Sequence, residues 1–211
     1  KREAQLGKEV LKLENVSIAS RHSEHDDAVK NVSFSMRQGE IVSIAGIEGN
    51  GQRELIFGIA GMMPIKEGKI FLNEQDITDT SIRYRNTHGI AHIPEDRHKD
   101  GLVLDYTLAN NLVLKQYFMP RFQNKGFLKF NEIKNYAESM IDKFDIRSSE
   151  GPKSITRSMS GGNQQKAILA REIDLKQDVI LAVQPTRGLD IGAISYIHQQ
   201  LVEQRNQGKS I

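Results

Sequence analysis

The strongest constraint on the fold comes from a glycine-rich loop that joins an apolar run to an amphipathic stretch. Residues 40–46 are a short apolar run, predicted to be a strand, and the loop that follows reads Gly-Ile-Glu-Gly-Asn-Gly-Gln-Arg over residues 46–53. Glycines at this spacing let several backbone N–H groups converge on phosphate oxygens, and the following helix, expected from Gln52 to Ile59, adds its positive end. Strand, loop and helix together predict the opening of an α/β unit. Taken alone, the same glycines also fit a tight strand-to-helix turn without a ligand.

Patterns on both sides of this loop predict further elements. Residues 10–18 and 29–36 alternate apolar and polar side chains, which is the period of a half-buried strand, and together they predict an antiparallel hairpin. Ser210 and Ile211 look like the beginning of another strand. The other expected elements are strands at 69–72, 89–94 and 179–183, a mostly helical segment over 107–146, and helices at 163–173 and 194–205.

Composition excludes several classes of protein. Hydrophobic residues make up 38% and charged residues 27%, which is an ordinary balance for one soluble domain of 211 residues. No apolar run approaches the roughly 20 residues that a membrane helix needs, and no signal peptide is expected from the charged first residues. Cysteine is absent, which excludes a disulfide framework or a thiolate metal site and fits the cytoplasm. A net charge of +2 argues against a nucleic-acid binder.

Two later motifs give the glycine loop its context. The segment at 160–166 reads Ser-Gly-Gly-Asn-Gln-Gln-Lys, and the apolar run at 179–183 continues as Gln-Pro-Thr-Arg-Gly-Leu-Asp over residues 184–190. The first resembles the signature motif of ATP-binding-cassette (ABC) proteins, and the second resembles their second acidic motif with its following loop. Their order and spacing match that family, and the resemblance covers essentially the whole chain.

The resemblance implies a fold and a division of the chain. We expect an α/β, P-loop ABC nucleotide-binding domain with an antiparallel β subdomain, an inserted α-helical subdomain and a truncated last strand. Residues 1–8 would be a linker, residues 9–94 and 155–211 the core with the β subdomain, and residues 95–154 the helical subdomain. The motifs at 94–97, 49–52 and 184–190 look like those of the C-terminal cassette of fused two-cassette ATPases, which serve simple-sugar and nucleoside importers. The Gln-Pro-Thr-Arg-Gly version at 184–188 looks most similar to the nucleoside branch.

The glycine loop departs from the family pattern at its two chemical positions. An active loop carries Lys and then Ser or Thr, where this chain has Gln52 and Arg53. Gln52 offers a neutral amide in place of a full positive charge on the β and γ phosphates. Arg53 has no lone pair for Mg²⁺, and its cation would repel the metal. The nucleotide-binding positions implied by the resemblance are Gly46, Glu48, Gly49, Asn50, Gly51, Gln52 and Arg53.

The catalytic positions are also changed. The Asp that organises Mg²⁺ in the family matches Val183, the catalytic Glu matches Gln184, and the Gln of the loop between the subdomains (the Q-loop) matches Glu95. An amide can orient a water molecule but cannot take its proton. We therefore expect a severe loss of hydrolysis at this site, with weak or partner-dependent ATP binding and a doubtful Mg²⁺ site. An autonomous ATPase or nucleotide switch not tied to transport is the alternative, and a relative that handles nucleic acid is a third.

The signature segment, in contrast, is intact. Ser160, Gly161, Gly162 and Asn163 match it, with Leu189 and Asp190 in the loop after the second acidic motif (the D-loop). Cassettes of this family pair head to tail, so these residues would complete the ATP site of a partner N-terminal cassette in the same polypeptide. Ser160 would hydrogen-bond the γ-phosphate there. The alternative for residues 160–163 is a simple helix-capping turn.

The resemblance also implies partners and a location. We expect membrane permease subunits, an indirectly coupled solute-binding protein, no nucleic acid, and a peripheral position on the cytoplasmic face of the plasma membrane. The helical segment would meet the permease, and its large apolar residues are either subdomain core or exposed for docking. These residues are Tyr117, Phe118, Met119, Phe122, Phe127 and Phe130. Residues 22–27 suggest a metal site or, more simply, a solvated turn.

Overall fold

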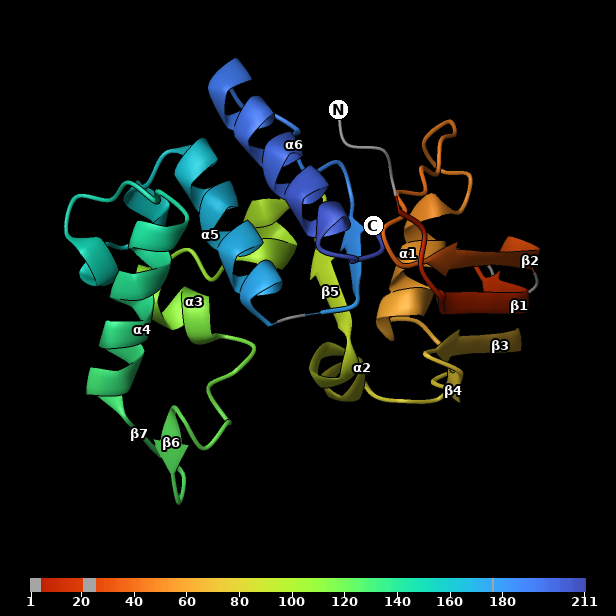
Figure 1. Cartoon of the computed structure of the whole chain (residues 1–211), viewed down its shortest axis with the longest axis horizontal. Helices are drawn as coiled ribbons and strands as arrows, with labels where there is room; N and C mark the ends of the chain where they lie inside the picture. Colours follow the sequence, from red (N-terminus) through yellow and green to blue (C-terminus); the bar gives the residue numbers. More distant parts are fainter. Residues whose placement is uncertain (1–4, 21–25, 176) are drawn as a thin grey trace. The chain divides into compact units, whose positions relative to one another are not determined.

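The computed structural model of the chain describes residues 5–20, 26–175 and 177–211. Its contacts divide the chain into two compact units, and Figure 1 colours both along the sequence. Of the described residues, the first unit contains 5–20, 26–92, 177–181 and 200–211, and the second contains 93–175 and 182–199. The predicted subdomain boundaries differ from this division and remain a prediction. The predicted polar turn at 22–27 falls largely on residues outside the described part.

The first unit contains the predicted antiparallel hairpin. β1 (Glu9–Ala19) pairs with β2 (Asp27–Arg37) on one side and with β3 (Glu67–Leu72) on the other, and β4 (Gln75–Asp76) completes the order β2-β1-β3-β4. Leu13 is aligned with Phe34 of β2 and with Ile70 of β3, so the central strand carries apolar side chains into one layer. The predicted hairpin and the predicted strand at 69–72 are both confirmed.

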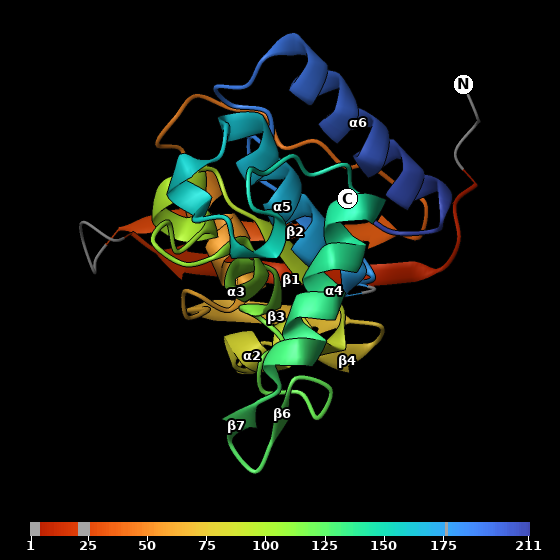
Figure 2. The ribbon, with the colours of Figure 1, turned by 90° about the vertical axis from the view of Figure 1, so that its left-hand side faces the viewer.

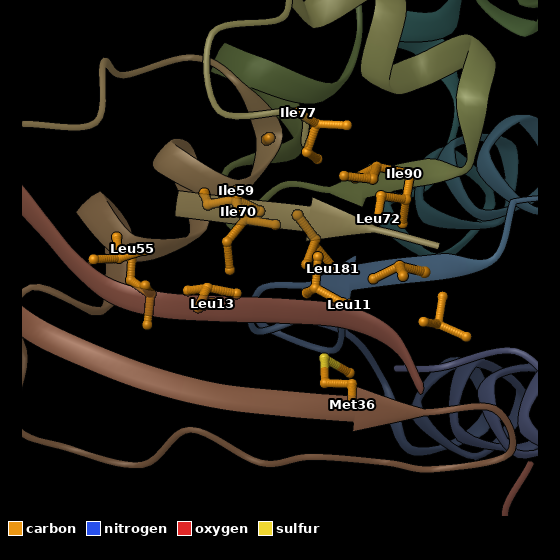
Figure 3. Close-up of a cluster of buried hydrophobic side chains, with 14 of the residues drawn as sticks. Leu11, Leu13, Met36, Leu55, Ile59, Ile70, Leu72, Ile77, Ile90 and Leu181 are labelled. Atoms are coloured by element: carbon orange, nitrogen blue, oxygen red, sulfur yellow. The ribbon is translucent and has the colours of Figure 1, made fainter. Parts of the chain in front are cut away.

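One apolar cluster fills the first unit. It packs the sheet against α1 (Gln52–Ala60), β5 (Ile90–Ile93) and β8 (Val179–Ala182), and Figure 3 shows its side chains converging from these elements. The predicted helix after the glycine loop is therefore confirmed, because its buried face belongs to this core. The buried members are Val10, Leu11, Leu13, Val16, Ile18, Val29, Met36, Leu55, Ile59, Ala60, Ile70, Leu72, Ile77, Ile90, Val179 and Leu181.

A buried arginine braces this unit. Arg85, on α2 (Ile82–His88), is 2% exposed, and its guanidinium donates hydrogen bonds to oxygen atoms of the surrounding chain. Its acceptors are the backbone oxygens of Gly58, Ile59, Ile77 and Thr78 and the hydroxyl of Thr80. The guanidinium thus joins the end of α1 to the segment after β4.

The predicted strand at residues 40–46 is wrong. Among the described residues, its ladder reaches only Ile211, whose N–H donates to Glu40 O at 2.9 Å and whose carbonyl accepts from Val42 N at 2.8 Å. Two bonds to one residue are too few for a strand, and Ile41 and Ile44 remain 45% and 47% exposed. Ser210, predicted to begin a strand, bridges to Val179 in the parallel sense.

The second unit is helical. It contains α3 (Leu108–Val113), α4 (Phe130–Lys143) and α5 (Gly161–Asp174). A short turn at Arg97–Gly101 precedes α3, and turns at Gly151–Lys153 and Thr156–Ser158 lie between α4 and α5. α6 (Ile191–Asn206) contributes residues 191–199 to this unit. The predicted helices at 163–173 and 194–205 are confirmed. The core consists of Leu108, Ala109, Leu112, Val113, Phe122, Ile133, Tyr136, Ala137, Met140, Phe144, Ile146, Met159, Ala167 and Ala170.

The expectation of a mostly helical segment at 107–146 needs a correction. A hairpin of β6 (Gln123–Asn124) and β7 (Phe127–Leu128) separates α3 from α4. Lys125 and Gly126 between its strands have φ angles of 50° and 88°, which suit a two-residue hairpin turn and interrupt a helix. Within the described part of the chain, no helix is long and apolar enough to span a membrane.

A charged cluster is buried in the second unit. Glu172 is fully buried and pairs with Lys115 Nζ at 2.7 Å and with Arg171 Nε at 3.0 Å. Burial lowers the pKa of Lys115, against the opposing effect of the Glu172 carboxylate. Arg171 also donates to the carbonyl of Gly101 at 3.0 Å, so the cluster ties α5 to the turn that follows Glu95.

Candidate functional site

The glycine loop belongs to the first unit and lies open to solvent. Residues 43–50 are all exposed, and α1 begins after Gly51, whose φ is 87°. A Cβ at Gly51 would lie 2.1 Å from the carbonyl oxygen of Ala28, so both the backbone angle and the space require glycine there. No side chain caps α1, and its first N–H groups therefore remain available to an anion.

The side chain of Gln52 folds back into this loop. Its Nε2 donates to the carbonyl of Ile47 at 3.1 Å, and a Cβ at Gly46 would lie 2.1 Å from the same nitrogen. The amide therefore closes the loop on itself. To contact a phosphate, Gln52 would have to give up that bond and would bring no charge in return.

Arg53 is turned toward an aromatic pair. Its guanidinium carbon lies 5.2 Å from the centroid of Phe57, which packs edge-on against His92 with 6.1 Å between centroids. A cation stacked in this way offers no lone pair to a metal. The residue present at this position therefore does not fit the Mg²⁺-ligand role that a hydroxyl would have.

The chain after β8 carries the changed catalytic positions into the second unit. Val183 N donates to Ile93 O at 3.0 Å, which continues the contact between β8 and β5, and its side chain has no polar atom. Gln184 is exposed and has a φ of 42°, in the left-handed region that few residues other than glycine adopt. Its carbonyl accepts from Arg187 N at 3.0 Å, which makes a tight turn.

Glu95, at the Q-loop position, is held by an ion pair. Its Oε1 meets Arg187 Nη1, and the backbone of Arg187 accepts from Arg97 Nη1 at 3.0 Å. The neighbouring Asp96 caps the turn at 97–101 by accepting from His98 N and Lys99 N, and these bonds lower the pKa of Asp96. The segment around Glu95 is thereby attached to the loop after Gln184.

The signature segment forms the beginning of α5. Ser160 is the N-cap: its hydroxyl accepts from Asn163 Nδ2 at 2.9 Å and more weakly from Asn163 N at 3.4 Å. Asn163 Oδ1 in turn accepts from Arg147 N at 2.8 Å. The capping turn weighed from the sequence is therefore present. It leaves Ser160 exposed, with the N-terminus of a 14-residue helix behind it.

The two signature glycines allow close packing within the second unit. A Cβ at Gly161 would lie 2.9 Å from Arg97 Nη2, and one at Gly162 would lie 3.2 Å from Ala193 Cβ. Asp190 caps the helix after it, because its Oδ1 accepts from Ala193 N at 2.9 Å. The structure thus brings the signature, Asp190 and the segment at 95–97 together in one unit.

Sequence reasoning gave no role to two residues that hold this arrangement. Arg187 contacts Glu95, and His98 Nε2 hydrogen-bonds Gln164 Oε1 of α5 at 2.8 Å. Neither contact has a sequence signal of its own, because each joins residues more than 60 positions apart. The glycine-loop residues lie in the first unit.

Comparisons with known proteins decide the family. The sequence profile described as ABC transporter matches residues 29–187. The chain belongs to the ABC transporter family. This result confirms the resemblance drawn from the three motifs.

Two curated relatives of this ABC cassette match it over almost its whole length. The nucleoside import ATP-binding protein NupA of Lactococcus lactis is 45% identical over 96% of the chain, and the guanosine import ATP-binding protein NupO of Bacillus subtilis is 43% identical over 100%. The chain covers 39% and 41% of these two proteins, so it spans about two fifths of their length.

A solved structure shows the same fold. A nucleotide-free ATP-binding cassette from an ABC transporter superposes with a TM-score of 0.77 at 21% identity, covering 96% of this chain and 79% of that one. The expected α/β ABC cassette fold, with its antiparallel sheet and helical segment, is therefore confirmed.

Proposed function

We propose that this chain is the C-terminal cassette of a two-cassette ATPase and that it supplies its signature motif to ATP held by the N-terminal cassette. The observation that supports this most is a contrast between two loops. In the glycine loop, the Gln52 amide is bonded to Ile47 O and Arg53 stacks on Phe57. At the start of α5, Ser160 caps the helix and remains exposed. The side chains at the two chemical positions of the glycine loop are thus engaged within the chain, while the signature segment keeps an exposed hydroxyl at a helix N-terminus, which can bind the phosphate of a neighbouring cassette.

Two further residues argue against hydrolysis at this cassette's own site. The side chain of Val183 offers no oxygen to a metal, and Gln184 cannot accept a proton from water. Each of these losses costs on the order of 100-fold or more in rate. Backbone N–H groups of the glycine loop remain, so ATP binding is weak and needs no metal. No catalytic step is assigned to this site.

The relatives support a transport role. Two are named as nucleoside and guanosine import ATP-binding proteins, and a ribose import ATP-binding protein of Clostridium tetani is 34% identical over 100% of the chain. We place this cassette in an importer of nucleosides or simple sugars. It would sit on the cytoplasmic face of the membrane, in contact with permease subunits and indirectly with a solute-binding protein.

The test compares the effects of two substitutions on the ATPase rate of the complete two-cassette protein. Ser160→Arg places a long cation where the γ-phosphate would approach and is expected to reduce ATPase activity by about 100-fold or more. Gln52→Ala, in the loop that performs no chemistry, is expected to change the rate less than about twofold. Ser158→Arg is the matched control, because Ser158 is also exposed and lies two residues before Ser160. Full activity of the Ser160→Arg protein, or loss of activity with Gln52→Ala, would overturn the proposal.

A further inference from the structure

The hairpin of β6 and β7 stands out from the helices of the second unit. Figures 1 and 2 both show it beyond the end of α4, away from α5. The hairpin is nevertheless well anchored: Lys129 N donates to Phe122 O at 2.8 Å, Gly126 N to Gln123 Oε1 at 2.9 Å, and Gln123 Nε2 to Phe118 O at 3.1 Å. A projecting segment is therefore held in one conformation from its base.

The side chains near the tip are apolar and uncovered. Phe127 is 80% exposed, Phe130 is 71% exposed and Leu128 is 40% exposed. Phe122 at the base is fully buried and packs edge-on against Tyr136, with 5.1 Å between ring centroids. Single exposed apolar residues are common on protein surfaces. Three within four positions on an anchored hairpin form a tip patch of Phe127, Leu128 and Phe130 that calls for a partner.

Positive charges surround the tip patch. Segment 119–134 carries four cations and one acid, Glu132, and all five are exposed. Lys129 Nζ is held beside the hairpin by a hydrogen bond to Pro120 O at 2.9 Å. The cations are Arg121, Lys125, Lys129 and Lys134, of which Lys134 pairs with Glu138 of α4 at 3.7 Å. The tip therefore combines exposed phenylalanines with an excess of positive charge.

We propose that this hairpin docks on a membrane surface that contains anionic lipids. Phe127 and Phe130 enter the boundary between headgroups and acyl chains, while the surrounding cations meet lipid phosphates. Aromatic and apolar residues among lysines and arginines are the side-chain set that binds such interfaces. The charge and the projecting shape favour a lipid surface over a protein groove. This contact does not depend on the nucleotide chemistry proposed above, and it would hold the helical unit against the bilayer.

The test is binding of the whole 211-residue chain to protein-free vesicles, measured by sedimentation. Vesicles of phosphatidylcholine with phosphatidylglycerol should bind the chain, while vesicles of phosphatidylcholine alone should bind it at least about tenfold more weakly. The double variant Phe127→Ser/Phe130→Ser should lose about tenfold or more in affinity for the anionic vesicles. Ile191→Ser is the matched control, since Ile191 is 83% exposed in the same unit, and it should bind as the parent does.

A second pair of variants tests the charges. The double variant Lys125→Gln/Lys129→Gln should bind anionic vesicles about tenfold or more weakly, because each cation contributes roughly fivefold to the affinity. Added salt should likewise lower the affinity of the parent protein for these vesicles. Lys99→Gln/Lys153→Gln removes the same charge from exposed positions elsewhere in the unit and should have little effect. Thermal melting of each variant checks that the fold is unchanged.

A fluorescent label locates the contact. The chain has no cysteine, so Asn124→Cys gives a single labelling position on the hairpin, and Ser195→Cys gives an exposed control on α6. The label at 124 should shift to shorter wavelength with anionic vesicles, while the label at 195 should not. Equal binding to both kinds of vesicle, an unchanged affinity of the phenylalanine variant, or binding only when permease protein is present would overturn the proposal.

Discussion

Single residues of the glycine loop differ from those of an active phosphate loop in what they contact. Gln52 is bonded to Ile47 O, and Arg53 lies on the ring of Phe57. Both side chains are thereby satisfied within the loop and its helix, without nucleotide. The identity of these residues was readable from the sequence, because the motif fixes their positions. Their contacts were not, because a motif does not say which way a long side chain turns.

Restoring the lysine should therefore strengthen nucleotide binding without restoring catalysis. Gln52→Lys places a full charge near the β and γ phosphates and is expected to increase ATP affinity about tenfold, since a bond to a charged group contributes about 1.5–3 kcal/mol. Isothermal titration measures this directly. Gln52→Met, similar in length and uncharged, is the control and should show no gain. Equal affinities of the Lys and Met variants would contradict the role assigned to this position.

The carboxylate of Asp76 gives a prediction about pH. Hydrogen bonds from the Thr78 hydroxyl and the Thr78 N–H, with Lys69 nearby, lower the pKa of Asp76 to about 2. Because the pKa of Asp76 is lower in the folded chain than in the unfolded chain, where it is about 4, the ionised carboxylate stabilises the fold at pH values above about 4. This contribution to stability is lost as the pH falls toward 2. Because Asp76 is largely exposed, Asp76→Asn should lower the free energy of unfolding by less than about 1 kcal/mol at pH 7.

Denaturant unfolding of the Asp76→Asn protein between pH 7 and pH 2 checks this sign. The difference from the parent chain should shrink as pH falls below about 4. Glu132→Gln, an exposed acid on α4, should show no comparable difference. A difference that grew toward low pH would mean that the bonds from Thr78 do not favour the charged form.

At the scale of whole elements, the strands and helices whose sequences show a clear hydrophobic period were predicted correctly. β1 and β2 alternate, and α5 begins with two glycines after the cap residue Ser160, so local sequence was enough for both. Two predictions failed, one of a strand and one of a continuous helical segment. Residues 40–46 have the apolar run of a strand, but a strand needs a partner ladder that sequence does not display. The β6–β7 hairpin was masked by flanking helical patterns, although Asn124, Lys125 and Gly126 are suitable turn residues.

The brace at Arg85 also belongs to this scale, because one side chain connects several segments. Arg85→Lys should destabilise the chain by about 2–4 kcal/mol, since an ammonium cannot reach acceptors on both sides of a planar guanidinium. Thermal or denaturant unfolding measures the loss. Arg83→Lys, on the same helix and exposed, should change the free energy of unfolding by less than about 0.5 kcal/mol. If both variants were equally stable, the prediction would be wrong, and water would have replaced the hydrogen bonds that the Arg85 guanidinium donates.

For the whole molecule, three motifs in register were enough to predict the fold and the family. The loss of chemistry at the phosphate site, inferred from the motifs, stays a prediction. The motifs did not predict that Glu95 is paired with Arg187 or that Arg97 lies against Gly161, because these contacts depend on how distant segments pack. In the second unit, the signature, the Q-loop position and the D-loop form one connected group. This arrangement supports our proposal that the chain acts on the nucleotide of a neighbouring cassette.

The most direct test of the proposed function is the ATPase rate of this chain alone and together with the N-terminal cassette that we propose belongs to the same polypeptide. We expect no turnover above background for the chain alone, and measurable turnover when the two cassettes are combined. Hydrolysis of ATP by the chain alone at about 1 s⁻¹ or faster, within the ordinary range for enzymes, would contradict this expectation. Gln52, Arg53, Val183 and Gln184 would then have to be compatible with catalysis.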